Sequence, residues 1–173
     1  RRIAGSGRDW TELTEEEETI LMEQCVDEVS TSYGADALHS DARNAYTINR
    51  LKRILCRSAW VLHKQLAAGS FRPTGFEVSF ADAGELETVN VSLKDRSRMH
   101  LQGRIDRIDT VETENAVYVK IVDYKSGMAE FDPVSLYYGL QLQLVVYLNA
   151  ALEMEQRLHP EREIVPAGIF YYP

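Results

Sequence analysis

Acidic, basic and amide side chains recur at short intervals in the second half of this chain. Gly103-Arg104-Ile105-Asp106-Arg107-Ile108-Asp109 is followed by Ile121-Val122-Asp123-Tyr124-Lys125-Ser126-Gly127. Both segments have the apolar alternation of β-strands. Gln143 and Tyr147 come later, four residues apart in a helical pattern, so they share one helix face. Carboxylates, an ammonium group and polar helix side chains are the groups needed to bind a divalent cation and hydrolyse a phosphodiester.

The spacing of the acids decides which of them belong together. Side chains two apart on a strand share a face, so Asp123 and Lys125 point the same way. Asp106 and Asp109 are three apart, so a regular strand sends them to opposite faces. We expect Asp106 in the site, because it follows Gly103, where a backbone or a substrate can approach closely.

These side chains predict a magnesium site. Asp106 and Asp123, together with the backbone carbonyl of Tyr124, form a set of hard oxygen ligands suited to Mg²⁺. The metal would polarise the scissile phosphate and activate a water molecule. Lys125 would orient that water or stabilise the phosphoryl oxygens. Glu77 lies on an earlier strand, pointing away from its aromatic neighbours, either to water or into a polar site.

Each signal has a simpler alternative. Asp-Xaa-Lys alone fits an exposed ion pair worth about 0–1 kcal/mol. Gln143 in so apolar a helix needs a polar partner or lines a site, and a satisfied core amide is the alternative. The order of the motifs along the chain, with two acid-bearing strands before the helix, favours the metal site over these alternatives.

Local signals predict the elements that position these residues. Thr14 and Glu17 form a capping box at the start of a helix that runs to about Tyr33, with Gly34 past its end. Asp132-Pro133 starts the last helix. We expect an α/β (α+β) fold with a mixed sheet flanked by helices, its first four strands in meander order and its fifth strand central. The remaining predicted elements are a helix over 42–68, strands over 75–80, 89–93, 99–109, 116–125 and 166–172, and the last helix over 132–158, mostly buried.

Composition limits the class of protein. The 173 residues are 45% hydrophobic, which is enough for a sizeable core, and no apolar run is long enough to span a bilayer. The net charge of −8 belongs mainly to residues 1–40, which hold ten acids and three bases. We therefore expect an acidic helical segment over 1–40 and the catalytic core over 41–173. Cys25 and Cys56 are too few and too far apart for a disulfide framework or a zinc site, which indicates reduced thiols in a cytosolic protein.

The combined motifs resemble the RecB-type nucleases of the PD-(D/E)XK superfamily, with the nearest likeness in the nuclease domain of the B subunit of AddAB-type helicase–nucleases. The likeness covers about residues 50–173. It includes Phe71-Arg72-Pro73 before Glu77, the strand motifs around Asp106 and Asp123, Tyr138-Gly139-Leu140-Gln141-Leu142-Gln143-Leu144 with Tyr147, and the strand over 166–172.

The resemblance implies a restriction-endonuclease-like fold and assigns roles to the residues. Asp106 and Asp123 would bind the metal, Lys125 would be the catalytic lysine, and Glu77 an upstream acid of the site. Gln143 and Tyr147 would complete it. Mg²⁺ would be the cofactor, with Mn²⁺ as a substitute.

The family degrades DNA from its ends while a helicase subunit unwinds it, in double-strand-break repair and recombination. The resemblance thus implies a cytoplasmic exodeoxyribonuclease whose partners are single-stranded or unwound DNA ends and a helicase subunit, with no membrane.

Two family features are missing from the sequence: a histidine-bearing helix upstream and four cysteines that bind an iron–sulfur cluster. Cys25 and Cys56 do not match the cluster spacing. The chain also begins without methionine, so we expect a fragment of a longer protein that lacks both of its ends, with the cluster in that parent. Two other functions remain open, a non-catalytic nuclease-like module for DNA binding or assembly, and a stand-alone endonuclease of the same superfamily.

Overall fold

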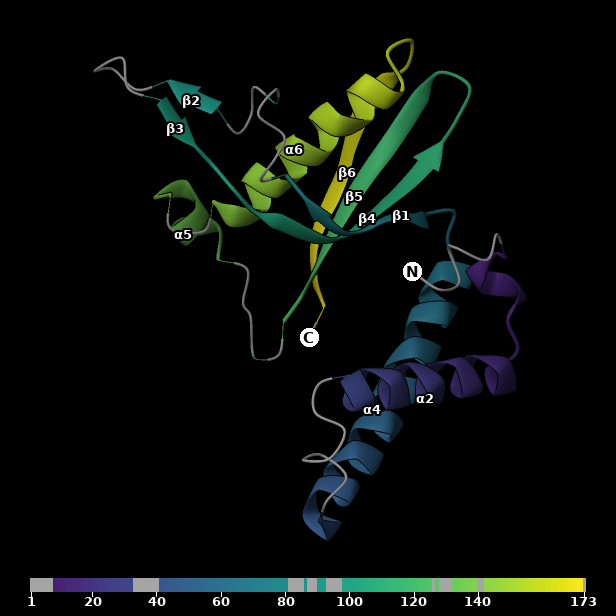
Figure 1. The fold of residues 1–173 in the computed structure, drawn as a ribbon. Coiled ribbons are helices and arrows are strands. Elements are labelled where there is room, and N and C mark those ends of the chain that lie inside the picture. The colour runs from purple at the N-terminus through teal and green to yellow at the C-terminus, as the bar shows by residue number, and fades with distance from the viewer. Residues whose placement is uncertain are drawn as a thin grey trace. The chain divides into compact units, whose positions relative to one another are not determined.

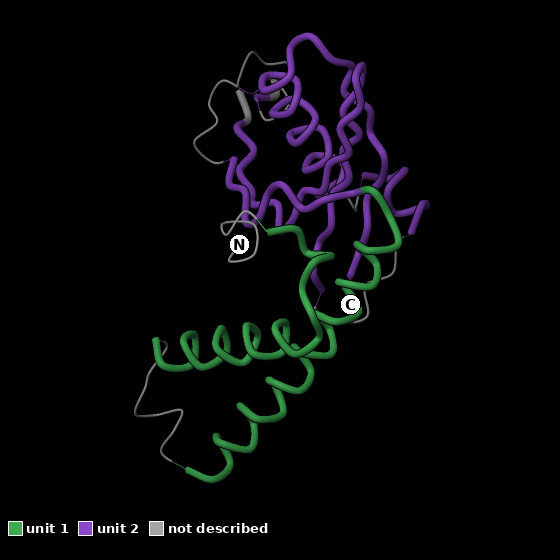
Figure 2. Tube along the Cα trace, turned by 90° about the vertical axis from the view of Figure 1, so that its right-hand side faces the viewer, with its two compact units in different colours: residues 1–70 green, residues 71–173 purple. Residues whose placement is uncertain are grey.

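The computed structural model describes residues 8–32, 41–80, 86, 90–92, 98–125, 127, 132–139 and 142–172. The chain forms two compact units, residues 1–70 and residues 71–173 (Figure 2). The helix that begins at residue 42 therefore groups with the first unit. The predicted boundary at residue 40 separates an acidic segment from the catalytic core. It divides the chain by function and not by compactness, so it stays a prediction.

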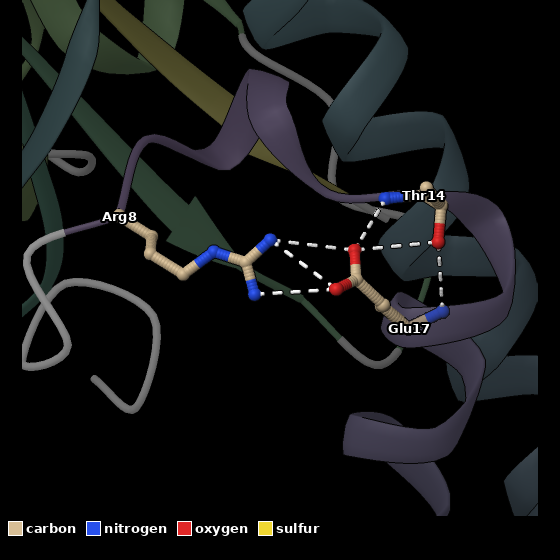
Figure 3. Close-up of polar contacts among 3 residues, drawn as sticks. All are labelled: Arg8, Thr14 and Glu17. Atoms are coloured by element: carbon tan, nitrogen blue, oxygen red, sulfur yellow. Dashed lines mark hydrogen bonds and ion pairs between the residues drawn. The ribbon is translucent and has the colours of Figure 1, made fainter.

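The first unit is helical. A capping box starts its first long helix, as the sequence predicted. The Thr14 hydroxyl accepts the Glu17 N–H at 3.2 Å, and the Glu17 carboxylate accepts the Thr14 N–H at 3.0 Å. Arg8 donates to the same carboxylate at 3.3 Å (Figure 3). The first backbone N–H groups of a helix have no acceptor within the helix, and the capping box supplies acceptors for them. The helices of this unit are the 3₁₀ turn η1 (Trp10–Glu12), α2 (Glu15–Ser32) and α4 (Ala42–Ala67).

The last described residue of α2 is Ser32 and that of α4 is Ala67. Each lies one residue before the predicted end of its helix. Asp41 caps α4 by accepting the Asn44 N–H at 2.7 Å. Lys52 of α4 pairs with Asp27 of α2 at 2.7 Å. Gly34, expected just past the first helix, lies outside the described residues.

The second unit is built on a mixed four-stranded sheet with the order β1-β4-β5-β6 (Figure 1). Strand β1 pairs with β4 and β4 with β5 in antiparallel directions, whereas β6 runs parallel to β5. Two further strands, β2 and β3, pair only with each other. The strands are β1 (Arg72–Ser79), β2 (Asn90–Ser92), β3 (Arg98–His100), β4 (Arg104–Glu112), β5 (Ala116–Tyr124) and β6 (Glu163–Tyr172).

The predicted strand topology was partly wrong. The segment 99–109 is two strands, β3 and β4, which belong to different sheets, so the four-strand meander does not form. Strand β6 lies at the edge of the four-stranded sheet and not at its centre. An apolar run is compatible with either place, because the neighbours of a strand are not encoded in its own alternation.

The last helix is also interrupted. It consists of α5 (Pro133–Tyr137) and α6 (Gln143–Leu158), and Gly139 between them has φ of +76°. Gly adopts this left-handed conformation without the steric cost that other residues have, which ends α5. The start of α5 agrees with the prediction, since Asp132 accepts the Val134 N–H at 2.9 Å. The expectation of a mostly buried helix was wrong, because Tyr137 is 85% exposed and Leu158 70% exposed.

Helix α6 packs against β5 and β6 and contributes side chains to the hydrophobic core of the second unit. The core joins Ile108, Val119 and Ile121 of the sheet to Leu144 and Ala150 of the helix. A mixed sheet with a helix against it confirms the predicted α/β, restriction-endonuclease-like architecture.

Two further findings concern the class of protein. Both cysteines, Cys25 and Cys56, are free and half-buried. Within the described part of the chain, no helix has the length and apolar character needed to cross a membrane.

Candidate metal-binding and catalytic site

Strands β4 and β5 bring the two predicted metal-binding acids together at one end of the sheet. Their register pairs Arg107 with Val122, so the preceding Asp106 falls opposite the following Asp123. By alternation these two carboxylates lie on the face that also carries Ile108 and Ile121, which is the core face. The two acids therefore lie at the end of the apolar core face, directly beyond Ile108 and Ile121.

Asp106 and Asp123 have different surroundings. Asp106 is half-buried, and its Oδ2 accepts the backbone N–H of Tyr124 at 2.8 Å. Asp123 is only 5% exposed, and its Oδ2 lies 2.5 Å from the Lys125 ammonium. Among the described residues, the Lys125 ammonium is the partner of this buried oxygen, which accepts no further hydrogen bond. A carboxylate oxygen has two lone pairs, so it can accept a further partner besides the ammonium.

Lys125 is the cation of this site. The contact with the Asp123 carboxylate raises the pKa of Lys125 above its ordinary value, and the negative charge of Asp106 acts in the same direction. The ammonium also lies 5.8 Å from the ring centroid of Tyr171, the β6 residue that pairs with Asp123. The arrangement favours a permanently charged lysine, suited to stabilising negative charge.

Glu77 lies on β1, between the pairs Phe76–Arg107 and Val78–Ile105, so it falls opposite Asp106. Its φ is +52°, a conformation that is strained for a residue with a side chain, and strained residues of this kind cluster at functional sites. Its carboxylate pairs with Arg104 at 2.7 Å, and because both side chains are well exposed the pair contributes little stability.

The conformation of Glu77 also alters the predicted strand pattern. Val78 and Phe80 pack with the core, whereas Phe76 is not among the core residues. The left-handed backbone at Glu77 interrupts the alternation between these residues. Left-handed backbone at one residue leaves no trace in the hydrophobic pattern, so sequence reasoning had no signal for it.

Gln143 and Tyr147 stand at the start of α6. Gln143 is exposed, so the alternative of a satisfied core amide was wrong. Its Nε2 donates to the Tyr147 hydroxyl at 2.8 Å. The Tyr147 ring packs edge-on against Phe80, with centroids 5.5 Å apart. Tyr147 also contacts Gly103, just before β4, since a Cβ there would lie 2.7 Å from Tyr147 Cε1. The Gln143–Tyr147 pair therefore lies beside the start of the strand that carries Asp106.

The structure brings together Asp106, Asp123, Tyr124 and Lys125: Asp106 bonds the Tyr124 N–H, Asp123 pairs with Lys125, and the charge of Asp106 acts on Lys125. For the part of the chain that is described, Glu77 and the Gln143–Tyr147 pair are not joined to them by hydrogen bonds or ion pairs. Ser126 and Gln141, also in the motifs, lie outside the described residues.

Asp109 has a different environment from Asp106. It is fully buried and pairs with Arg107 at 2.6 Å and Lys120 at 2.9 Å on the other face of the sheet. Neither Tyr171 nor Arg104 had a predicted role. The pairing of β6 with β5 brings Tyr171 beside Lys125, and Arg104 pairs with the Glu77 carboxylate.

The residues present fit a divalent cation. No group of three or more His, Cys, Asp or Glu side chains suited to a metal occurs among the described residues. Two carboxylates on neighbouring strands are nevertheless sufficient for Mg²⁺, which keeps several waters and often uses only one or two carboxylates. The buried Asp123 carboxylate, whose Oδ2 meets the Lys125 ammonium and accepts no other hydrogen bond among the described residues, is the observation that favours a cation here.

The mixed sheet with a helix against it defines a restriction-endonuclease-like fold. Residues 5–173 match the model of the PD-(D/E)XK nuclease superfamily, and the chain belongs to that superfamily. The match confirms the resemblance seen in the motifs.

Curated relatives agree with this assignment. Over 94% of its length the chain is 45% identical to a protein of Lachnoclostridium phytofermentans and 41% identical to one of Alkaliphilus metalliredigens. It is also 42% identical, over 95% of its length, to a protein of Clostridium acetobutylicum. Each of the three is named as the B subunit of an ATP-dependent helicase/deoxyribonuclease. The chain spans only 13–14% of the length of these relatives.

Proposed function

We propose that this chain is a Mg²⁺-dependent deoxyribonuclease domain that digests DNA from its ends. The observation that carries the proposal is the buried Asp123 oxygen, held against Lys125 and beside Asp106 on the neighbouring strand. Membership of a nuclease superfamily supports the reaction class. The names of the relatives support work beside a helicase subunit.

Asp106, Asp123 and the backbone carbonyl of Tyr124 would hold the Mg²⁺, and Mn²⁺ would substitute for it. When bound, the cation supplies positive charge that polarises a phosphate and lowers the pKa of a bound water. The neighbouring Tyr124 N–H already orients the Asp106 carboxylate, at 2.8 Å, so this acid is held in place before any ligand arrives.

The other side chains act on the DNA. Lys125 presents its charge to the phosphoryl oxygens, where negative charge grows as the P–O bond breaks. Gln143 and Tyr147 hold each other at 2.8 Å, and together they orient the DNA strand at the start of α6. Glu77, whose side chain is 40% exposed, orients the attacking water or the neighbouring phosphate.

The setting of the reaction follows from the same proposal. A helicase subunit would unwind broken ends and feed single strands to this domain in the cytoplasm, in double-strand-break repair and recombination. The iron–sulfur cluster expected from the resemblance would use cysteines other than Cys25 and Cys56, which lie in the helices of the first unit.

Degradation of end-labelled single-stranded DNA tests the proposal. The protein at its natural length, with its helicase partner, is assayed with Mg²⁺ and with EDTA, as wild type and as Asp123→Ala. We expect EDTA to abolish cleavage and Asp123→Ala to lower its rate a hundredfold or more, about the effect of removing a group that stabilises transition-state charge. Linear strands should be degraded and circular strands spared.

Two controls make the result specific. Glu114→Ala removes an exposed acid in the turn between β4 and β5 and should leave cleavage unchanged. ATP-dependent unwinding by Asp123→Ala should match wild type, which shows that the complex is intact. Cleavage that persists in Asp123→Ala would place the chemistry elsewhere and leave this chain a non-catalytic module. Cleavage of circular strands would indicate an endonuclease.

A further inference from the structure

A buried charged cluster lies on the face of the sheet opposite the two acids of the site. The Arg107 guanidinium forms two parallel hydrogen bonds to Asp109, at 2.6 and 2.7 Å. Lys120, which pairs with Asp109 across the strands, approaches the same carboxylate at 2.9 Å. Arg107 is 5% exposed and Asp109 fully buried, and Lys120 lies over the ring of Phe71 at 4.7 Å.

The stability of the sheet does not by itself explain this cluster. Removing charges from water costs several kcal/mol per ion, and apolar residues of similar volume often serve a core equally well or better. A buried guanidinium does, however, fix the direction of its remaining N–H groups, because two of them are already bound to one carboxylate.

One of those remaining groups reaches the strand that carries the site. Arg107 Nη1 donates to the Tyr124 hydroxyl at 2.9 Å, and the Tyr124 ring packs edge-on against Tyr172 with centroids 5.6 Å apart. The backbone N–H of Tyr124 donates in turn to Asp106 Oδ2. Tyr124 is thus tied to two consecutive residues of β4, to Arg107 on one face of the sheet and to Asp106 on the other.

These ties lie where the backbone ladder between the strands stops. The β4–β5 pairs end at Arg107–Val122, so the segment that carries Asp123 and Tyr124 has no further ladder pair with β4. On its other side this segment still pairs with β6, through Asp123–Tyr171 and Tyr124–Tyr172. Toward β4 it is held by the two hydrogen bonds of Tyr124, one from its backbone N–H to Asp106 and one to its hydroxyl from Arg107.

We propose that Arg107 and the Tyr124 hydroxyl are positioning residues, which hold the end of β5 at the distance from β4 that lets Asp106, Asp123 and the Tyr124 carbonyl bind one cation. Asp109 and Lys120 orient Arg107 for this task. The inference rests on the proposed function, because it concerns the same cation site.

Binding of Mn²⁺, followed by electron paramagnetic resonance of the free ion, tests the inference on the natural-length protein with its helicase partner. The relevant sites are those that Asp123→Ala removes. Tyr124→Phe deletes only the oxygen that Arg107 contacts and keeps the ring and the backbone. We expect it to weaken Mn²⁺ binding at these sites about tenfold, the lower end of the range for partners that orient metal ligands. Tyr118→Phe, on the same strand and the same face but six residues away, is the matched control and should bind Mn²⁺ like wild type.

Two further measurements separate positioning from general stability. Arg107→Met should weaken Mn²⁺ binding about tenfold in the wild-type background and have little added effect in Tyr124→Phe, because both changes break the Arg107–Tyr124 bond. Arg107→Met also removes the two bonds to Asp109, which are not bonds to the site. In the absence of metal, the Tyr124 amide should exchange its hydrogen faster in Tyr124→Phe than in Tyr118→Phe, since its bond to Asp106 is less well held.

Each outcome decides the inference. Wild-type Mn²⁺ affinity in Tyr124→Phe would overturn it while leaving the proposed nuclease intact. An equal effect of Arg107→Met in both backgrounds would also overturn it, since Arg107 would then act without the hydroxyl. A wild-type protein with no Mn²⁺ site dependent on Asp123 would overturn this inference and the proposed function together.

Discussion

Gly103→Ala should be among the most damaging small changes in the second unit. A Cβ at this position would lie 2.4 Å from Phe80 Cζ, 2.7 Å from Tyr147 Cε1 and 2.9 Å from Phe80 Cε1. Carbon atoms in contact prefer about 3.5–4.0 Å, so the rings must move by roughly 1 Å to make room. Overpacking of this kind costs about 1–3 kcal/mol.

The structure also indicates which ring moves. Phe80 is fully buried, and its backbone N–H donates to the Gly103 carbonyl at 3.1 Å, so neither the ring nor the local backbone has free space. Tyr147 is only partly buried and is the ring that can be displaced. Its displacement would stretch the 2.8 Å bond from Gln143, so Gly103→Ala should also lower DNA cleavage if that pair orients the strand.

Urea unfolding of the 173-residue chain, followed by hydrogen exchange in peptides from β4 and α6, measures the effect. We expect a loss of about 1–3 kcal/mol for Gly103→Ala, located in the second unit. Gly127→Ala is the control, because a Cβ there meets no atom of the described residues within 4 Å, and it should change the free energy of unfolding by less than about 0.5 kcal/mol. The double variant Gly103→Ala/Phe80→Leu should lose less unfolding free energy than the sum of the losses of the two single variants, because the smaller side chain makes room for the added Cβ. A Gly103→Ala variant as stable as wild type would refute the packing described here.

Two other expected outcomes concern stability. Thr14→Ala removes the hydroxyl that caps the Glu17 amide, so the free energy of unfolding of the first unit should fall by about 1 kcal/mol in urea titrations. Thr19→Ala, whose hydroxyl bonds only a carbonyl of its own helix, should have less effect, and an equal loss in both would contradict the capping role. Burial raises the pKa of Glu155 in α6 despite the opposing charge of His159, so ionisation of Glu155 destabilises the folded chain as pH rises through and above the ordinary glutamate pKa of about 4.3. Glu155→Gln should therefore be more stable than wild type in urea at pH 7, with the gain disappearing below pH 4, and a gain that is the same at both pH values would contradict this assignment.

The sequence by itself determined the elements whose signals are local. The capping box of Thr14 and Glu17 and the Asp132-Pro133 start were predicted from a few adjacent residues, because capping bonds form within one helical turn. The shared face of Asp123 and Lys125 follows from the two-residue period of a strand, and the structure places their side chains 2.5 Å apart. The candidate site was therefore largely visible as spacing and residue type.

Tertiary structure decided what depends on distant partners. The edge position of β6, the separation of β3 from β4 and the break at Gly139 all concern pairing or backbone conformation that hydrophobic alternation does not encode. The contact of Arg107 with Tyr124 also depends on distant partners, because the register of β4 with β5 brings the two residues together. Local periodicity specifies which face a side chain occupies, whereas the neighbour that it meets there is specified by the free energy of the whole packed sheet.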